Sequence, residues 1–203
     1  MKLKFCGIRR PEDAEFVNET KPDYIGFIFA SSKRYVSPED AGKLAAVIDP
    51  DIKKAGVFVN ESIEGIINTA KILGIDIIQL HGDESAEFIS ELRKLTDCEI
   101  WKAVRVRSSE DILNAEKLGA DKLLLDSFSK EAYGGTGKVA DWDVIKNTKI
   151  NTPFFVAGGL KEDNILTAVS ELDPYGLDIS GGIETDGCKD IGKMRKIISL
   201  LGR

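Results

Sequence analysis

Residues 55–73 read AGVFVNESIEGIINTAKIL, and this stretch holds the pattern that decides the fold. Residues 55–59 are a short, nearly continuous apolar run, which is typical of a strand covered on both faces in a parallel sheet. Asn60 follows and is expected to cap a helix. Apolar residues then recur with the 3.6-residue period of an amphipathic helix: Ile63, Ile66, Ile67, Ala70 and Leu73. The stretch therefore predicts one strand-then-helix unit.

The same unit recurs along the whole chain. We expect eight strands, at residues 3–6, 24–29, 55–59, 75–80, 99–104, 122–126, 154–157 and 175–180, each followed by a helical pattern. Eight such units in succession predict an α/β fold, a (β/α)8 TIM barrel of near-minimal size, with residues 1–203 forming one domain. A doubly wound open sheet is the alternative. No GxGxxG follows the first strand, however, and eight strands are many for that class.

Helix start signals support these boundaries. Pro11 can open the first helix, and Ser37 followed by Pro38 offers a capping serine with proline at the first helical position. Asp83 is expected to cap the helix that follows residues 75–80. No linker or low-complexity segment divides the chain.

The composition excludes several classes of protein. The chain has 203 residues and a net charge of −6, which argues against a nucleic-acid-binding surface. No apolar run approaches the ~20 residues of a membrane span, and Lys2 and Lys4 interrupt the start of the chain, where a signal peptide would have its apolar core. Three widely spaced cysteines and one histidine make a disulfide framework or a zinc site unexpected. We therefore expect a cytoplasmic protein without a membrane partner or a metal.

Chemically active side chains fall where the predicted strands end. In a (β/α)8 barrel the active site lies at the carboxyl ends of the strands. A thiol, an arginine, the only histidine and two carboxylates are expected at this one rim: Cys6, Arg34, His81, Asp126 and Asp178. The coincidence carries more weight than any one of these residues.

Two glycine pairs follow the last two predicted strands. Gly158-Gly159 comes after residues 154–157, and Gly181-Gly182 comes after residues 175–180. Barrels commonly hold a substrate phosphate at this place, on backbone N–H groups and the start of a short extra helix. Residues 186–188 are expected to begin or precede that helix. Ordinary tight turns are the alternative, but two pairs in succession favour a phosphate site.

Taken in order, the motifs KFCGI, GFIFASSKRYVS, AGVFVN, IIQLHGDE, LLLDSF, GGTGKVADW, FVAGGL and LDISGGIET span the chain. In this combination they resemble the phosphoribosylanthranilate isomerase family of tryptophan biosynthesis. One departure is that the family more often has Ser-Ser-Gly where this chain has Ser180-Gly181-Gly182. Little is lost if backbone N–H groups bind the phosphate, whereas a side-chain hydroxyl contact would be missing.

The resemblance implies an Amadori rearrangement of N-(5-phosphoribosyl)anthranilate, a phosphorylated aminosugar, into 1-(2-carboxyphenylamino)-1-deoxyribulose 5-phosphate, without a cofactor. The family pattern makes Cys6 the general base that removes the C2 proton, and Asp126 the general acid that protonates the ring oxygen. A thiolate would be favoured by the following helix, by Arg9 or Arg10, or by the substrate's iminium. Monomers and homodimers both fit such a family.

The remaining site residues follow from the same resemblance. Arg34 matches the arginine that meets the anthranilate carboxylate, a planar anion suited to a guanidinium. His81 is expected to line the sugar or anthranilate side of the pocket, and Asp178 to meet the substrate. The alternatives are a hydrogen-bonded structural histidine and a capping or loop carboxylate. Residues 127–139, which include GGTG, are predicted to form a lid.

Three rival functions use the same fold. The aminoaldose isomerase of histidine biosynthesis has similar chemistry but an aspartate where Cys6 stands. Indole-glycerol-phosphate synthase would carry a lysine near the same rim. A catalytically silent barrel that binds a sugar phosphate is the third. The Cys6-Gly7 pair argues against the first two, and the presence of Cys6 together with Asp126 argues against the last.

Overall fold

The computed structural model describes residues 1–127 and 142–203. The eight barrel strands are β1 (Lys2–Cys6), β2 (Tyr24–Ile28), β3 (Lys53–Phe58), β4 (Ile77–Leu80), β5 (Glu99–Val106), β6 (Lys122–Ser127), β7 (Phe154–Val156) and β8 (Gly176–Ile179). They close into a barrel in chain order, and every neighbouring pair is parallel. The predicted (β/α)8 barrel is therefore confirmed, and the open sheet is excluded.

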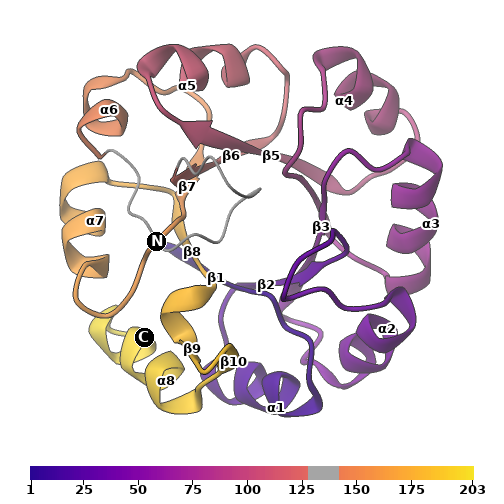
Figure 1. Ribbon diagram of the computed structural model, residues 1–203, viewed down its shortest axis with the longest axis vertical. Coiled ribbons are helices and arrows are strands. Elements are labelled where there is room, and N and C mark those ends of the chain that lie inside the picture. The colour runs from indigo at the N-terminus through magenta and orange to yellow at the C-terminus, as the bar shows by residue number, and fades with distance from the viewer. Residues whose placement is uncertain (128–141) are drawn as a thin grey trace.

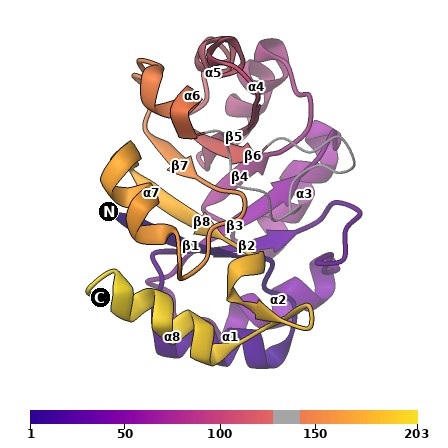
Figure 2. The ribbon, with the colours of Figure 1, turned by 60° about the vertical axis from the view of Figure 1, so that its left-hand side comes forward.

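Helices surround the strands as a ring (Figure 1). They are α1 (Pro11–Thr20), α2 (Pro38–Val47), α3 (Ile63–Leu73), α4 (Ala86–Arg93), α5 (Ser109–Glu116), α6 (Trp142–Asn147), α7 (Ile165–Leu172) and α8 (Ile191–Leu200). A short 3₁₀ helix, η1 (Gly181–Ile183), and the hairpin strands β9 (Glu184–Thr185) and β10 (Cys188–Lys189) lie between β8 and α8. Turning the molecule shows α8 beside α1, which closes the ring (Figure 2).

Serine side chains cap the amino termini of α2, α3 and α4. The Ser37 side chain accepts from the Asp40 N–H at the start of α2, as predicted. The caps of the next two helices are Ser62 and Ser85, so the predictions of Asn60 and Asp83 are wrong by two positions.

Asn60 has a different role in the loop after β3. It takes a left-handed conformation with φ of 52°, and its Oδ1 accepts from the Asp83 N–H at 2.7 Å. The two residues thus tie the loops after β3 and β4 together instead of starting helices.

Strand residues alternate between two cores. Those facing outward, such as Leu3 and Phe5 of β1, pack under the helices. Those facing inward fill the barrel, where the Trp101 ring stacks on the Phe155 ring with centroids 4.6 Å apart and Tyr24 meets Trp101 edge-on. These rings fill the amino-terminal half of the barrel, so its polar residues are left to the carboxyl half. No helix in the described part of the chain has the length and apolar character needed to cross a bilayer.

Candidate active site

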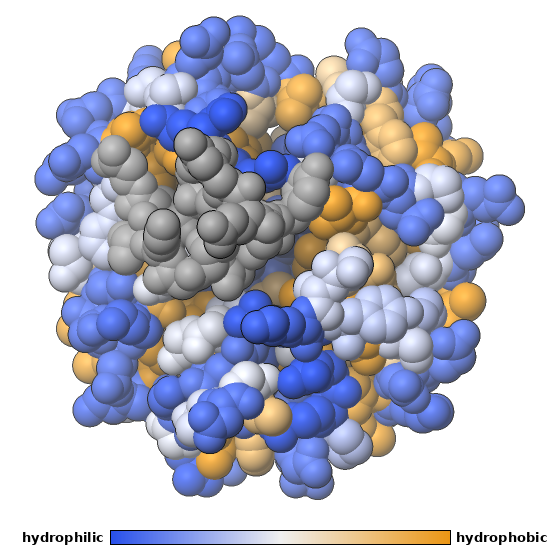
Figure 3. All heavy atoms as spheres, viewed as in Figure 1, coloured by the Kyte–Doolittle hydropathy of each residue, from blue (hydrophilic) through white to orange (hydrophobic). Residues whose placement is uncertain are grey.

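The predicted rim residues meet at the carboxyl mouth of the barrel. Cys6 is the last residue of β1, Asp126 is the last but one of β6, and His81 directly follows β4. In the space-filling view, hydrophilic side chains gather near the centre of this face, beside a hollow that exposes apolar residues (Figure 3). The mouth therefore combines titratable groups with exposed apolar surface, as ligand sites commonly do.

Cys6 is a buried free thiol. Gly26 of the neighbouring β2 makes room for it, because a Cβ on Gly26 would lie 2.6 Å from the Cys6 sulfur and 3.2 Å from the Lys4 Nζ. Burial raises the pKa of the Cys6 thiol, and the Lys4 ammonium, with Lys189, opposes that rise. Lys4 thus lies beside the sulfur, although sequence analysis assigned it no role.

Lys4 is fully buried and belongs to an ion pair inside the barrel. Its Nζ lies 3.1 Å from each carboxylate oxygen of Asp178 and donates to the Gln79 Oε1 at 2.8 Å. Burial acts to lower the pKa of Lys4, but the Asp178 carboxylate and the Cys6 sulfur together outweigh it and the pKa is raised. Lys4 therefore carries its charge at neutral pH, and Asp178 is held from within the barrel.

His81 lies between Gln79 and Asp126. Its Nδ1 is 3.2 Å from the Gln79 Nε2, and its Nε2 is 3.4 Å from the Asp126 Oδ2. The imidazole is thus near both the buried amide and the carboxylate predicted as the general acid. Its Nε2 is buried and forms no hydrogen bond with the described residues.

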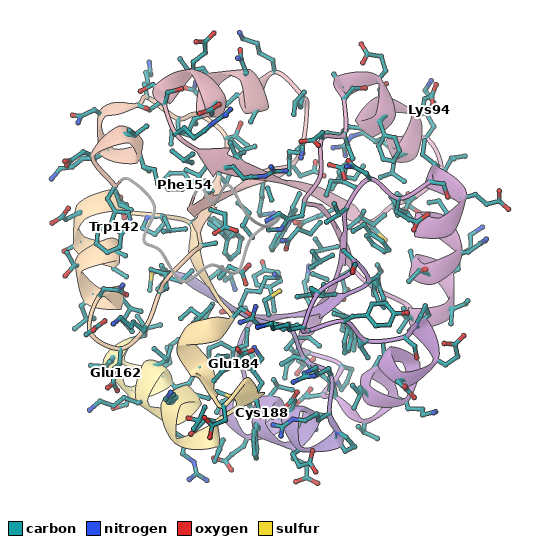
Figure 4. All side chains as sticks on the ribbon, in the orientation of Figure 1. Lys94, Trp142, Phe154, Glu162, Glu184 and Cys188 are labelled. Carbon is teal, nitrogen blue, oxygen red and sulfur yellow. The ribbon has the colours of Figure 1, made fainter. Side chains whose placement is uncertain are left out.

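Arg34 reaches the mouth from the loop after β2. Its Nε and Nη2 donate to the two carboxylate oxygens of Glu184, each at 2.8 Å. The Arg34 chain lies over Gly7, where a Cβ would be 2.8 Å from the Arg34 Cδ. Glu184, labelled in Figure 4, stands on the hairpin after β8.

A second buried lysine connects this pair to Cys6. The Lys189 Nζ donates to the Glu184 Oε1 at 2.7 Å and to the Ser180 carbonyl at 3.1 Å. Ser180 in turn donates from its hydroxyl to the Cys6 carbonyl at 2.9 Å. The strand that carries the thiol and the hairpin that holds Arg34 are therefore fixed to each other.

The two glycine-rich turns pack against one another. Gly158 and Gly159 both have positive φ, which favours glycine. A Cβ on Gly182 would lie 1.9 Å from the Leu160 carbonyl oxygen, so the turn after β7 and η1 are in direct backbone contact. Gly181 and Gly182 themselves form η1, whereas residues 186–188 turn the β9–β10 hairpin and do not start a helix.

All five rim side chains and both glycine turns thus come together, and four further residues join them. Lys4, Gln79, Glu184 and Lys189 were not predicted. A signal existed for two of them, because Lys4 and Gln79 precede Cys6 and His81 by two positions and so share their face of the strand. Arg9 and Arg10, predicted to influence the thiol, instead donate to the Gly187 carbonyl and the Asp13 carboxylate.

Two further points concern the predicted lid and possible metal ligands. Most of the stretch predicted as a lid lies outside the described residues, because these omit 128–141. Within residues 1–127 and 142–203, the His, Cys, Asp and Glu side chains form no group of three or more suited to a metal ion.

A closed (β/α)8 barrel with a thiol, an imidazole and carboxylates at its carboxyl mouth defines a TIM-barrel enzyme. Residues 3–199 match the model of the family described as N-(5'phosphoribosyl)anthranilate (PRA) isomerase. The chain belongs to this family, whose members are isomerases of tryptophan biosynthesis.

Individual relatives agree along nearly the full length. The N-(5'-phosphoribosyl)anthranilate isomerase of Thermoanaerobacter pseudethanolicus is 42% identical over 198 residues, which are 98% of this chain and 96% of that protein. The solved phosphoribosyl anthranilate isomerase of Thermotoga maritima is 32% identical with a TM-score of 0.87, covering 98% of this chain and 97% of that one. A phosphoribosyl anthranilate isomerase solved in complex with reduced 1-(O-carboxyphenylamino)-1-deoxyribulose 5-phosphate is 31% identical with a TM-score of 0.82, at the same coverage.

Proposed function

We propose that the chain converts N-(5-phosphoribosyl)anthranilate into 1-(2-carboxyphenylamino)-1-deoxyribulose 5-phosphate, with Cys6 as general base and Asp126 as general acid. Asp126 protonates the furanose ring oxygen, the bond from C1 to that oxygen breaks, and the nitrogen lone pair forms an iminium. Cys6 removes the C2 proton, and the electrons of that bond neutralise the iminium to give an enolamine. The enolamine tautomerises to the ketone, so the product is an isomer of the substrate.

The environment of Cys6 supports its role as base. Burial raises the pKa of the thiol, so the resting enzyme holds mostly the neutral form. The buried Lys4 ammonium and the cationic iminium of the bound substrate both stabilise the thiolate. The base is thus available when the substrate carries the positive charge that makes its C2 proton acidic.

Contacts at the mouth support the substrate-binding roles. The Arg34 guanidinium uses Nε and Nη2 for Glu184. No described residue accepts a hydrogen bond from its Nη1, which can therefore bind the anthranilate carboxylate. The phosphate binds the backbone N–H groups of the turns at Gly158, Gly159, Gly181 and Gly182. His81 and Asp178 face the sugar between these two ends. A ligand that carries both a carboxylate and a phosphate suits this set of cationic and N–H groups.

The observation that carries the proposal is the meeting of Cys6 and Asp126 at one mouth of the barrel, from strands 1 and 6 of the closed sheet. Cys6→Ala and Asp126→Asn should each lower kcat/KM by on the order of 10²–10⁴-fold, measured by the loss of substrate fluorescence. Cys98→Ala, which removes a thiol at the amino end of β5, is the control and should keep full activity. A protein that binds the substrate without turning it over, or a Cys6→Ala variant with full activity, contradicts the proposal.

A further inference from the structure

A line of buried polar contacts crosses the barrel beneath the reacting groups. It begins at the Asp178 carboxylate on β8, continues through the Lys4 ammonium on β1 and the Gln79 amide on β4, and reaches the His81 imidazole. The last step is the 3.4 Å approach of the His81 Nε2 to the Asp126 carboxylate. This line connects the interior of the barrel to the predicted acid, Asp126. Gln79 itself has no role in either proton transfer of the proposed mechanism.

Donor and acceptor chemistry fixes the orientation of the Gln79 amide. A lysine ammonium only donates hydrogen bonds, so the atom of Gln79 that lies 2.8 Å from the Lys4 Nζ must be the carbonyl oxygen. The NH₂ group of Gln79 therefore points the other way, to the His81 Nδ1 at 3.2 Å. Lys4 thus decides which end of the amide faces the histidine.

The orientation of the Gln79 amide in turn determines which ring nitrogen of His81 carries the proton. A nitrogen that receives an N–H must offer a lone pair, so the His81 Nδ1 carries no proton. The ring is then neutral, with its single proton on Nε2, on the side of Asp126. An imidazolium would need an acceptor at Nδ1, and Gln79 cannot provide one while its oxygen binds Lys4.

We propose that Lys4 and Gln79 are positioning residues that hold His81 as the neutral imidazole with its proton on Nε2, facing Asp126. An imidazolium next to Asp126 would favour the ionised carboxylate, which has no proton to give. A neutral ring brings no positive charge beside Asp126, so it favours this ionisation less than an imidazolium would, and Asp126 can hold the proton that opens the sugar ring. This catalytic consequence rests on the proposed function, because it takes Asp126 as the acid. The protonation pattern of His81 is independent of the proposed function.

The single histidine of the chain makes the test direct. In protein labelled with ¹⁵N-histidine, the imidazole signals belong to His81 alone and report which nitrogen carries the proton. At neutral to slightly alkaline pH, the wild-type ring should show a protonated Nε2 and a bare Nδ1. A ring protonated on Nδ1, or on both nitrogens, overturns the proposal.

Gln79→Glu replaces the hydrogen-bond donor that faces the His81 Nδ1 with an acceptor, with almost no change in side-chain shape. A carboxylate only accepts hydrogen bonds, so it keeps the contact with Lys4 and requires a proton on the His81 Nδ1. The spectrum should change to a protonated Nδ1, and a wild-type spectrum overturns the proposal. Gln79→Leu keeps the Lys4–Asp178 ion pair and should give a mixture of both neutral forms, so it provides a second test if the glutamate variant does not fold.

Kinetics test the positioning role separately. Gln79→Glu should lower kcat by roughly 10- to 100-fold, with KM changed much less, because it disturbs the acid and not the groups that bind the two ends of the substrate. Asn68→Asp, an amide-to-carboxylate change on the exposed face of α3, is the control and should change neither value. An unchanged kcat alongside the altered spectrum contradicts the positioning role, whereas full activity of Asp126→Asn contradicts only the proposed function.

Discussion

Arg34 and Glu184 form a bidentate ion pair at the mouth of the barrel, although they are 150 positions apart in the chain. The guanidinium presents Nε and Nη2 to both carboxylate oxygens, each at 2.8 Å. This fork-to-fork geometry fixes the plane of the guanidinium as well as its position. Glu184 is itself fixed by Lys189. The carboxylate partner of Arg34 within the protein therefore determines where its remaining N–H groups can meet the substrate.

Glu184→Gln should raise the KM for phosphoribosylanthranilate by about tenfold, with a smaller change in kcat. The NH₂ group of a glutamine only donates, so Arg34 loses one of two charge-assisted hydrogen bonds, each worth roughly 1.5–3 kcal/mol, and its fixed orientation. Steady-state kinetics measure the effect. Glu162→Gln, on the outside of the barrel (Figure 4), should leave KM unchanged.

A substrate without the carboxylate separates the role of Arg34 from general damage. For N-(5-phosphoribosyl)aniline, the wild type and Glu184→Gln should have the same KM within a factor of about two, because nothing in this substrate binds the guanidinium. An equal loss for both substrates would mean that Glu184 supports the fold of the mouth instead of the orientation of Arg34.

Lys4→Met should make the Cys6 thiol harder to ionise. Burial already raises the pKa of this thiol, and the Lys4 ammonium opposes the rise, so its removal raises the pKa further. The rate of alkylation by iodoacetamide at neutral pH should fall by about tenfold, which corresponds to about one pH unit. The measurement needs the Cys98→Ser/Cys188→Ser background, so that Cys6 is the only thiol.

Other charged groups around the sulfur set the size of this effect. Among the described residues, the charged groups that act on Cys6 include Lys4, Asp178, Lys189 and Arg34. Because Asp178 raises the thiol pKa, Lys4→Met/Asp178→Asn should slow alkylation less than the single change, and it avoids a buried carboxylate without a partner. Lys2→Met, at the outer start of the same strand, should have no effect. Equal alkylation profiles for Lys4→Met and the wild type would contradict a role for Lys4 at the thiol.

The barrel was predictable because its elements depend on local patterns. Continuous apolar runs mark buried parallel strands, and the helical period follows each run. The caps were less predictable, since Asn60 and Ser62 are both good capping residues two positions apart. The choice depended on a contact outside the local sequence, the hydrogen bond from the Asp83 N–H to Asn60.

The polar interior was not predictable for a related reason. In the sequence Lys4 interrupts an apolar strand, and such a lysine is normally exposed. It is buried because Asp178, 174 positions away, provides the opposite charge. Glu184 was missed for the same reason, as its partner Arg34 is 150 positions away. Lys189 was missed although its partners Ser180 and Glu184 are only nine and five positions away, because its burial follows from the packing of the hairpin and not from a local apolar pattern. The rim residues were found because their positions at strand ends are a local property.

Gly182→Ala should weaken both the fold and phosphate binding. The new Cβ would lie 1.9 Å from the Leu160 carbonyl oxygen, and a backbone atom cannot move aside as a flexible side chain can. We expect a loss of roughly 1–3 kcal/mol in the free energy of unfolding, measured by urea denaturation, together with a higher KM. Gly42→Ala is the matched control, since no heavy atom lies within 4 Å of its new Cβ and alanine favours a helix by up to about 1 kcal/mol. Equal stability of the two variants would contradict the close packing of the two glycine turns.

Asp23 connects both ends of the chain, which lie on the same side of the barrel in Figures 1 and 2. Its carboxylate accepts from the Lys2 Nζ, the Leu3 N–H and the Arg203 guanidinium. Burial acts to raise the pKa of Asp23, but these partners outweigh it and lower the pKa to about 2. Since the unfolded value is about 3.9, the unfolded chain takes up a proton more readily than the folded one between these two values. The stabilisation is therefore complete above about pH 5 and is lost as the pH falls toward 2.

Asp23→Asn should accordingly lower the urea midpoint near neutral pH, and its deficit relative to the wild type should shrink between about pH 5 and about pH 2. Asp51→Asn, at an exposed position, should show a small difference that does not depend on pH. The physical reason is that protonated Asp23 no longer holds the charges of Lys2 and Arg203, so at low pH the wild type has already lost what the variant lacks. A deficit of the same size at both ends of this range would mean that Asp23 acts through its shape and neutral hydrogen bonds, not through its charge.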